Sequence, residues 1–118
     1  MGRGECMCTE LQLHKINKEM EKCYQKVYGT AIYAIFLYGS YARGDYDEES
    51  DIDYVAVVHG DRLELQEKLK EIWSLSAEIG LNNDVIISPV VIPYNEFTEY
   101  QEVLPFYNNI KEEGKRIG

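Results

Sequence analysis

The hydrophobic positions of this chain form two patterns, a helical spacing and short continuous runs, and each pattern predicts a different kind of element. Between Thr9 and Gly29, apolar residues recur at steps of three and four, which places them on one face of a helix. This face consists of Leu13, Ile16, Met20, Cys23 and Val27. Thr9 and Gln12 have the spacing of a capping box, and Gly29 is a suitable terminator. We expect this helix to pack on the core and to carry no chemistry.

Three short apolar runs rich in β-branched and aromatic residues predict buried strands. They span residues 31–38, 51–58 and 84–92. Because proline cannot donate a hydrogen bond to a sheet, Pro89 predicts that the third strand lies at an edge or contains a bulge. Pro93 is expected to close that strand.

The remaining segments predict helices and turns. Asp61 to Glu64 has capping-box spacing, so a helix should run to about Ile79 and end at Gly80. Its expected buried side consists of Leu65, Leu69, Ile72, Trp73, Ser76 and Ile79. Beyond Pro93, residues 94–103 and 105–113 read as short helical pieces, so that 105–118 form a helical tail. Residues 1–8 are expected to be a loose N-terminus.

This order of elements predicts one domain over residues 1–118, of the α/β (α+β) class. A small mixed β-sheet with helices packed mainly on one face is the natural arrangement. The odd number of cysteines, three, argues against a disulfide framework and fits a reducing compartment. No apolar run is long enough to span a membrane, and no signal peptide is recognisable, so we expect a cytoplasmic protein.

Charge narrows the classes of function. The formal net charge is −9, from 21 acidic and 12 basic residues. Such a surface repels polyanions, so stable binding of long nucleic acid is not expected. A local basic spot could still accept one triphosphate, particularly with metal ions present.

Two aspartates begin the second predicted strand. Residues two apart in a strand point to the same face, so Asp51 and Asp53 share one face with Val55 and Val57. Two neighbouring carboxylates repel each other and resist burial unless a cation lies between them. Mg²⁺ is suited to one or two carboxylates plus phosphates and water. The alternative is that both aspartates sit at a solvated end of the strand.

A glycine and a serine follow the first predicted strand. Gly39 would let the backbone approach a ligand closely, and a short helix starting at Ser40 would present N–H groups to an anion. Taken alone, this pair is also compatible with an ordinary turn. Ten residues separate Gly39-Ser40 from Asp51-Ile52-Asp53, so that an anion cradle and a metal-binding strand can lie side by side.

The segment FLYGSYARGDYDEESDIDYVAVV, residues 36–58, resembles the signature of minimal nucleotidyltransferases of the DNA polymerase β superfamily. The tail segment PFYNNIKEEG, residues 105–114, is similar to that of these small proteins. The resemblance implies the polymerase-β-like fold and a nucleotide site formed by Gly39, Ser40, Arg43 and Ser50. Arg43 has the alternative of pairing with Asp45, Asp47 or Glu48.

The resemblance also implies catalytic and metal-binding roles. Asp51 and Asp53 would hold two Mg²⁺ ions, and a third carboxylate is usual on a neighbouring strand. Asp84, the first residue of the third predicted strand, is the matching candidate; it would sit beside Asp53, help to hold one metal ion and take the proton of the acceptor hydroxyl. Asp84 could instead cap a turn.

The activity so implied is Mg²⁺-dependent transfer of a nucleoside monophosphate, AMP from ATP, to an acceptor hydroxyl. Members of this group pair with helical HEPN toxins, so the resemblance implies a HEPN-type partner protein as acceptor. The alternatives are an antitoxin that binds by contact without catalysis, and transfer to a small molecule of the aminoglycoside type.

Overall fold

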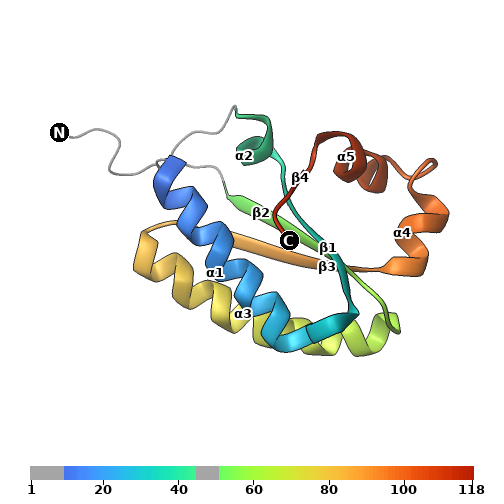
Figure 1. Cartoon of the computed structure of the whole chain (residues 1–118), viewed down its shortest axis with the longest axis horizontal. Coiled ribbons are helices and arrows are strands. Elements are labelled where there is room, and N and C mark those ends of the chain that lie inside the picture. The colour runs from blue at the N-terminus through green and yellow to red at the C-terminus, as the bar shows by residue number, and fades with distance from the viewer. Residues whose placement is uncertain (1–9, 45–50) are drawn as a thin grey trace.

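The computed structural model describes residues 10–44 and 51–118. The predicted capping residue Thr9 and the predicted loose segment 1–8 lie outside this part of the chain. The helices are α1 (Glu10–Tyr28), the 3₁₀ turn η1 (Gly29–Ala31), α2 (Ser40–Arg43), α3 (Arg62–Asn83), α4 (Tyr94–Tyr100) and α5 (Pro105–Glu113). The strands are β1 (Ile32–Tyr38), β2 (Ile52–Val58), β3 (Ile87–Pro93) and β4 (Lys115–Arg116). Figure 1 shows one sheet with α1 and α3 side by side across it.

The four strands form a mixed sheet in the order β3-β2-β1-β4. β2 runs antiparallel to β1 and parallel to β3, while β4 pairs antiparallel with β1. The predicted α+β class with a small mixed sheet is therefore confirmed. β3 is an edge strand, as Pro89 predicted, and β2 is central.

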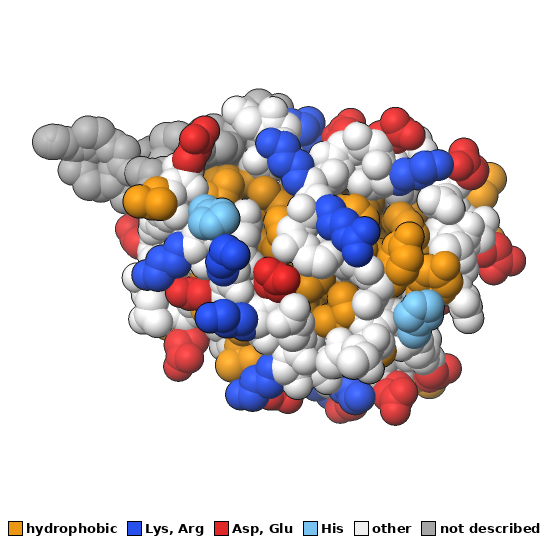
Figure 2. Space-filling view, viewed as in Figure 1, with side chains coloured by type: hydrophobic (Ala, Val, Ile, Leu, Met, Phe, Trp, Pro, Cys, Tyr) orange, Lys and Arg blue, Asp and Glu red, His pale blue; other side chains and the backbone are white. Residues whose placement is uncertain are grey.

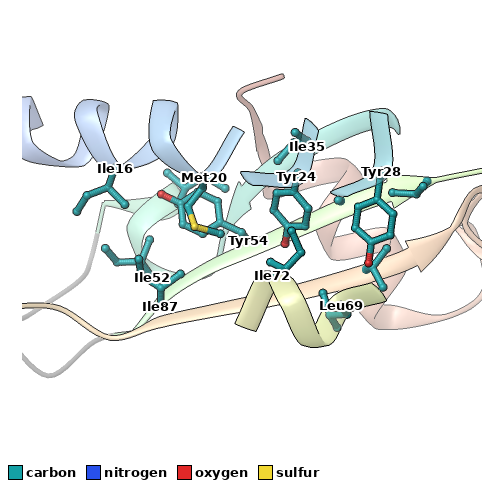
Figure 3. Packing of buried hydrophobic residues seen from close by; sticks show 14 of the residues in the cluster. Ile16, Met20, Tyr24, Tyr28, Ile35, Ile52, Tyr54, Leu69, Ile72 and Ile87 are labelled. Carbon is teal, nitrogen blue, oxygen red and sulfur yellow. The ribbon is translucent and has the colours of Figure 1, made fainter. Parts of the chain in front are cut away.

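The long helices α1 and α3 cover one face of the sheet. Alternate residues of β2, including Ile52 and Tyr54, are fully buried against them. Tyr24 and Tyr28 of α1 point towards α3, among the side chains of Ile72 and Leu69 (Figure 3). Their hydroxyls donate to backbone carbonyls, Tyr24 to Val90 at 3.0 Å and Tyr28 to Leu65 at 2.8 Å. Such bonds satisfy polar groups that would be costly to bury alone.

The short helices α4 and α5 pack against the opposite face. Here the core contains Val55 and Val57 of β2, together with Phe97 of α4 and Ile110 of α5. The two faces of β2 are therefore divided as its period-two pattern predicted. Asp53 lies on the same face of β2 as Val55 and Val57, at the end of the strand that neighbours α2.

Three local expectations are corrected. α3 continues through Gly80 to Asn83, and the chain then turns back so closely that a Cβ on Gly80 would stand 2.6 Å from the carbonyl oxygen of Val85. Trp73 was expected on the buried side but is half exposed. The C-terminal segment after α5 was expected to be helical, yet it forms β4 on β1.

The predicted start of α3 is confirmed, since the Asp61 side chain accepts from the backbone N–H groups of Leu63 and Glu64. Gly29, with φ of 61°, ends α1 as predicted. Within the described ranges, no helix has both the length and the apolar character that crossing a membrane requires.

Candidate active site

Asp53 lies near the start of β2, the strand between β1 and β3. Across the antiparallel pair it faces Tyr38, the last residue of β1, and across the parallel pair it lies beside Ser88 of β3. Asp51 directly precedes β2, and its Oδ2 is 3.5 Å from the Ser88 hydroxyl, which donates to it. Two carboxylates and one hydroxyl are thereby gathered at the end of the sheet where β2 begins.

Gly39 brings the backbone after β1 against this group. Its φ of 79° lies in the left-handed region that favours glycine. A Cβ at this position would stand 2.6 Å from Asp53 Oδ2. The close approach that the Gly-Ser pair predicted is therefore made to the side chain of a candidate metal ligand.

A short helix follows at once, as the sequence predicted. Ser40 opens α2, and the N–H groups of Ala42 and Arg43 both bond to the Gly39 carbonyl at 3.1 Å. This turn folds the chain back above β2, so the start of α2 and the start of β2 are neighbours. Ser50, which the motif assigned to the nucleotide site, lies outside the described residues.

The electrostatic balance of the site centres on Asp53. Partial burial raises the pKa of its carboxyl above the ordinary value, the neighbouring charge of Asp51 raises it further, and Arg43 opposes both. Burial, followed by the charge of Asp53, likewise raises the pKa of the Tyr38 phenol. Because burial and repulsion both disfavour the ionised carboxylate, the site gains from a bound cation.

Arg43 connects this site to the C-terminal helix. Its Nη1 lies 3.6 Å from Glu113 Oε1 at the end of α5, and both side chains are about half exposed, at 47% each. The alternative partners considered for Arg43, Asp45, Asp47 and Glu48, lie outside the described residues. Glu113 had no recognisable signal of its own, because the contact joins segments seventy residues apart in the sequence.

The placement of Asp84 differs from the expectation. β3 begins at Ile87, and Asp84 forms the C-cap of α3, with φ of 58° and its N–H bonded to the Gly80 carbonyl. The residue beside Asp53 on β3 is Ser88, so no carboxylate occupies the strand position that the third ligand required. Asp84 adopts the capping alternative in its backbone, and its catalytic role stays a prediction. The sequence pattern places the start of this strand at Asp84 instead of Ile87, and so it does not identify Ser88 as the neighbour of Asp53.

The donor set agrees with a Mg²⁺ site completed by substrate. In residues 10–44 and 51–118, no three or more His, Cys, Asp or Glu side chains cluster as metal ligands. Two carboxylates with a neighbouring hydroxyl match the partial protein shell that Mg²⁺ takes when phosphates and water supply the other ligands. Asp51 and Asp53 fit this arrangement.

Comparison with known proteins decides the family. The family model described as a nucleotidyltransferase domain matches residues 12–117. This chain belongs to that family. It is a nucleotidyltransferase, as the resemblance seen in residues 36–58 implied.

Individual relatives agree with this assignment. A protein of Methanocaldococcus jannaschii named "putative protein adenylyltransferase" is 37% identical over 81 residues, which cover 69% of this chain and 80% of the relative. A second protein of that organism with the same description is 34% identical over 101 residues, covering 86% of this chain and 93% of the relative. Among solved structures, a toxin–antitoxin crystallised with AMP-PNP superposes with a TM-score of 0.57 at 18% identity, over 86% of this nucleotidyltransferase and 72% of that chain. The last likeness concerns the fold alone.

Proposed function

We propose that this nucleotidyltransferase is a Mg²⁺-dependent protein adenylyltransferase, which moves AMP from ATP to a hydroxyl of a partner protein and releases pyrophosphate. The observation that carries the proposal is the contact of Gly39 with Asp53. A phosphate held by the turn after β1 would lie next to the carboxylates that hold the metal. The names of the two M. jannaschii relatives support AMP as the transferred group and a protein as the acceptor.

In this proposal each group of the site has a separate task. Gly39, Ser40 and Ser50 contact the β- and γ-phosphates, and Arg43 offsets their charge. Asp51 and Asp53 would hold two Mg²⁺ ions, which when bound would supply positive charge to stabilise the negative charge of the transfer. The chain therefore contributes mainly positioning and charge stabilisation.

Two points concern the acceptor. A HEPN-type toxin is the proposed partner, and the toxin–antitoxin with AMP-PNP supports this choice because its fold is similar. Asp84, assigned by motif order to take the proton of the acceptor, is proposed on that order alone, because Ser88 holds the strand position beside Asp53. A contact-only antitoxin would need neither ATP nor Mg²⁺, and an aminoglycoside-type enzyme would transfer AMP to a small molecule.

Calorimetry of ATP binding separates these functions. The full chain is titrated with ATP in Mg²⁺ and in EDTA, beside an Asp51→Asn/Asp53→Asn variant. We expect binding that needs Mg²⁺ and disappears in the variant. Incubation with ATP labelled at the α-phosphate and with candidate partner proteins or aminoglycosides then identifies the acceptor. Failure to bind any NTP, alone or with a HEPN-type partner present, would favour the contact-only function.

A further inference from the structure

The turn between α4 and α5 holds large apolar side chains at the surface. Val103 is 70% exposed, and Tyr100, Leu104 and Phe106 are 36–43% exposed. We name these four residues the α4–α5 patch. In Figure 1 they belong to the turn at the right of the molecule and to the helix ends that flank it. Solvent-exposed apolar groups gathered in one place commonly mark an interaction site.

The patch is built on a folded turn. The N–H groups of Val103 and Leu104 both bond to the Tyr100 carbonyl, at 3.0 and 2.9 Å, and the N–H of Asn108 bonds to the Leu104 carbonyl at 3.0 Å. An ion pair of 2.6 Å between Lys111 and Glu102 joins the turn to α5. These bonds give the turn a defined backbone, on which the four apolar side chains stay partly exposed.

The patch borders the active site. The Phe106 ring meets the Tyr38 ring edge to face, with centroids 5.5 Å apart. Tyr38 is in turn the cross-strand neighbour of Asp53. One aromatic ring thus separates the patch from the carboxylates, so a segment bound on it can extend directly to the site of transfer.

The surroundings of the patch are acidic. Residues 94–113 carry five glutamates and one lysine. Figure 2 shows acidic side chains spread over α4 and α5 along the upper and right rim of the molecule. Glu99 and Glu112 form no ion pair within the described part of the chain, whereas Lys111 is already engaged by Glu102. A complementary partner would surround an apolar contact with basic residues.

We propose that the α4–α5 patch is the docking surface for the protein acceptor. The occupant is a segment of the partner protein that places apolar side chains on the patch, carries arginine or lysine on either side, and presents its acceptor hydroxyl beyond Tyr38 towards Asp53. This inference rests on the proposed function, since it supplies the surface that brings a protein hydroxyl to the site.

Two exposed leucines near the opposite ends of α3 provide an internal control. Leu63 and Leu81 of α3 are 80% and 84% exposed, and they belong to the helical layer on the opposite side of the sheet from α4 and α5. The double variants Val103→Ser/Leu104→Ser and Leu63→Ser/Leu81→Ser each remove two exposed aliphatic side chains. Leu104 is the N-cap of α5, where serine is favourable, so the first variant is expected to fold.

The probe is a fluorescent peptide with a central Leu-Tyr-Leu segment between arginines, together with a counterpart in which glutamates replace the arginines. Fluorescence anisotropy with the full chain, in the absence of ATP, measures binding apart from any chemistry. We expect the basic peptide to bind and the acidic peptide not to bind. The Val103→Ser/Leu104→Ser variant should weaken binding by at least about tenfold, as the loss of central apolar contacts does in interfaces, while the α3 variant should leave it unchanged.

A photo-crosslinker in the peptide gives the position of the contact. Crosslinks within residues 100–107 would support the proposal. Equal affinity for the two peptides, no binding of the basic peptide, equal weakening in both variants, or crosslinks confined to α3 would each overturn it. Loss of Mg²⁺-dependent ATP binding in the unmodified protein would instead overturn the proposed function, so the two failures remain distinguishable.

Discussion

The backbone of Gly39 lies so close to the side chain of Asp53 that a methyl group on Gly39 would stand 2.6 Å from Oδ2. β1 and β2 are antiparallel, with Tyr38 opposite Asp53, and this register places the turn after β1 over the beginning of β2. The turn at Gly39, which is expected to hold phosphate, and the side chain of Asp53, which is expected to bind the metal, therefore lie directly beside each other.

Gly39→Ala should remove function through this contact. The methyl group would displace the Asp53 carboxylate, and φ of 79° would strain the alanine. We expect Mg²⁺-ATP affinity to fall by at least about tenfold and the free energy of unfolding to fall by about 1–3 kcal/mol. Calorimetry and urea unfolding measure the two effects.

Gly29→Ala is the matched control. Gly29 also has positive φ, 61°, but a methyl group added there would have no atom of the described residues within 4 Å beyond its chain neighbours. The variant should lose about 1–2 kcal/mol of stability from the backbone conformation alone and keep its ATP affinity. Equal loss of affinity in both variants would show that the Gly39 contact has no special role.

Asp53→Asn should stabilise the protein free of metal while removing Mg²⁺ binding. Burial, and then the charge of Asp51, raise the pKa of Asp53, so its ionised form is disfavoured in the folded state. Asparagine keeps the shape without the charge, and melting at neutral pH in EDTA should therefore occur at a higher temperature than in the unmodified protein. Added Mg²⁺ and ATP should raise the melting temperature of the unmodified protein only.

The raised pKa of Asp53 also predicts how stability and Mg²⁺ binding depend on pH. Because the folded-state pKa of Asp53 is raised, its contribution to stability is present below the unfolded pKa and is lost as pH rises through the folded pKa. Mg²⁺ binding needs the ionised form, so it should weaken on acidification at a higher pH than expected for an ordinary aspartate. Mg²⁺ titrations of the unmodified protein at a series of acidic pH values measure the pH at which binding is lost, with Asp53→Asn as the control that does not bind Mg²⁺.

Arg43→Gln should weaken ATP binding by about tenfold, the usual scale for losing one charge-assisted contact. Arg43 lowers the pKa of Asp53, so its removal should raise that pKa. The pH below which Mg²⁺ binding is lost should therefore also become higher. Glu113→Gln, which removes the partner of Arg43 on α5, should change stability by less than about 0.5 kcal/mol because the pair is half exposed. If Arg43→Gln loses Mg²⁺ binding at the same pH as the unmodified protein, Arg43 does not act on Asp53 as proposed.

Asp84→Asn and Ser88→Asp test where the third carboxylate belongs. Asparagine tolerates the left-handed backbone of Asp84, and Asp84 precedes β3, so we expect Asp84→Asn to keep its fold and its Mg²⁺ affinity. Ser88→Asp adds a carboxylate beside Asp53 and should tighten Mg²⁺ binding while lowering stability without metal. If Asp84→Asn loses AMP transfer as completely as Asp53→Asn, then Asp84 is the third catalytic carboxylate that the family resemblance implies, although it lies at the C-cap of α3 and not on β3.

The local chemistry of this chain could be predicted without a structure. Short apolar runs located β1 and β2, and a period of 3.6 located α1, each to within a residue of the observed bounds, and Pro89 indicated an edge strand or a bulge, because these features depend on neighbours in the sequence. The spacing of Gly39-Ser40 and Asp51-x-Asp53 was enough to indicate the family.

Contacts between distant segments were decided only by the tertiary structure. Gly80 resembles a helix terminator, but α3 continues past it to Asn83. The two residues of β4 are too few to show a strand period, and pairing with β1 alone makes them a strand. Ser88 and Glu113 became part of the site through register and helix packing, since hydrogen-bond pairing between strands brings together residues that no local pattern connects.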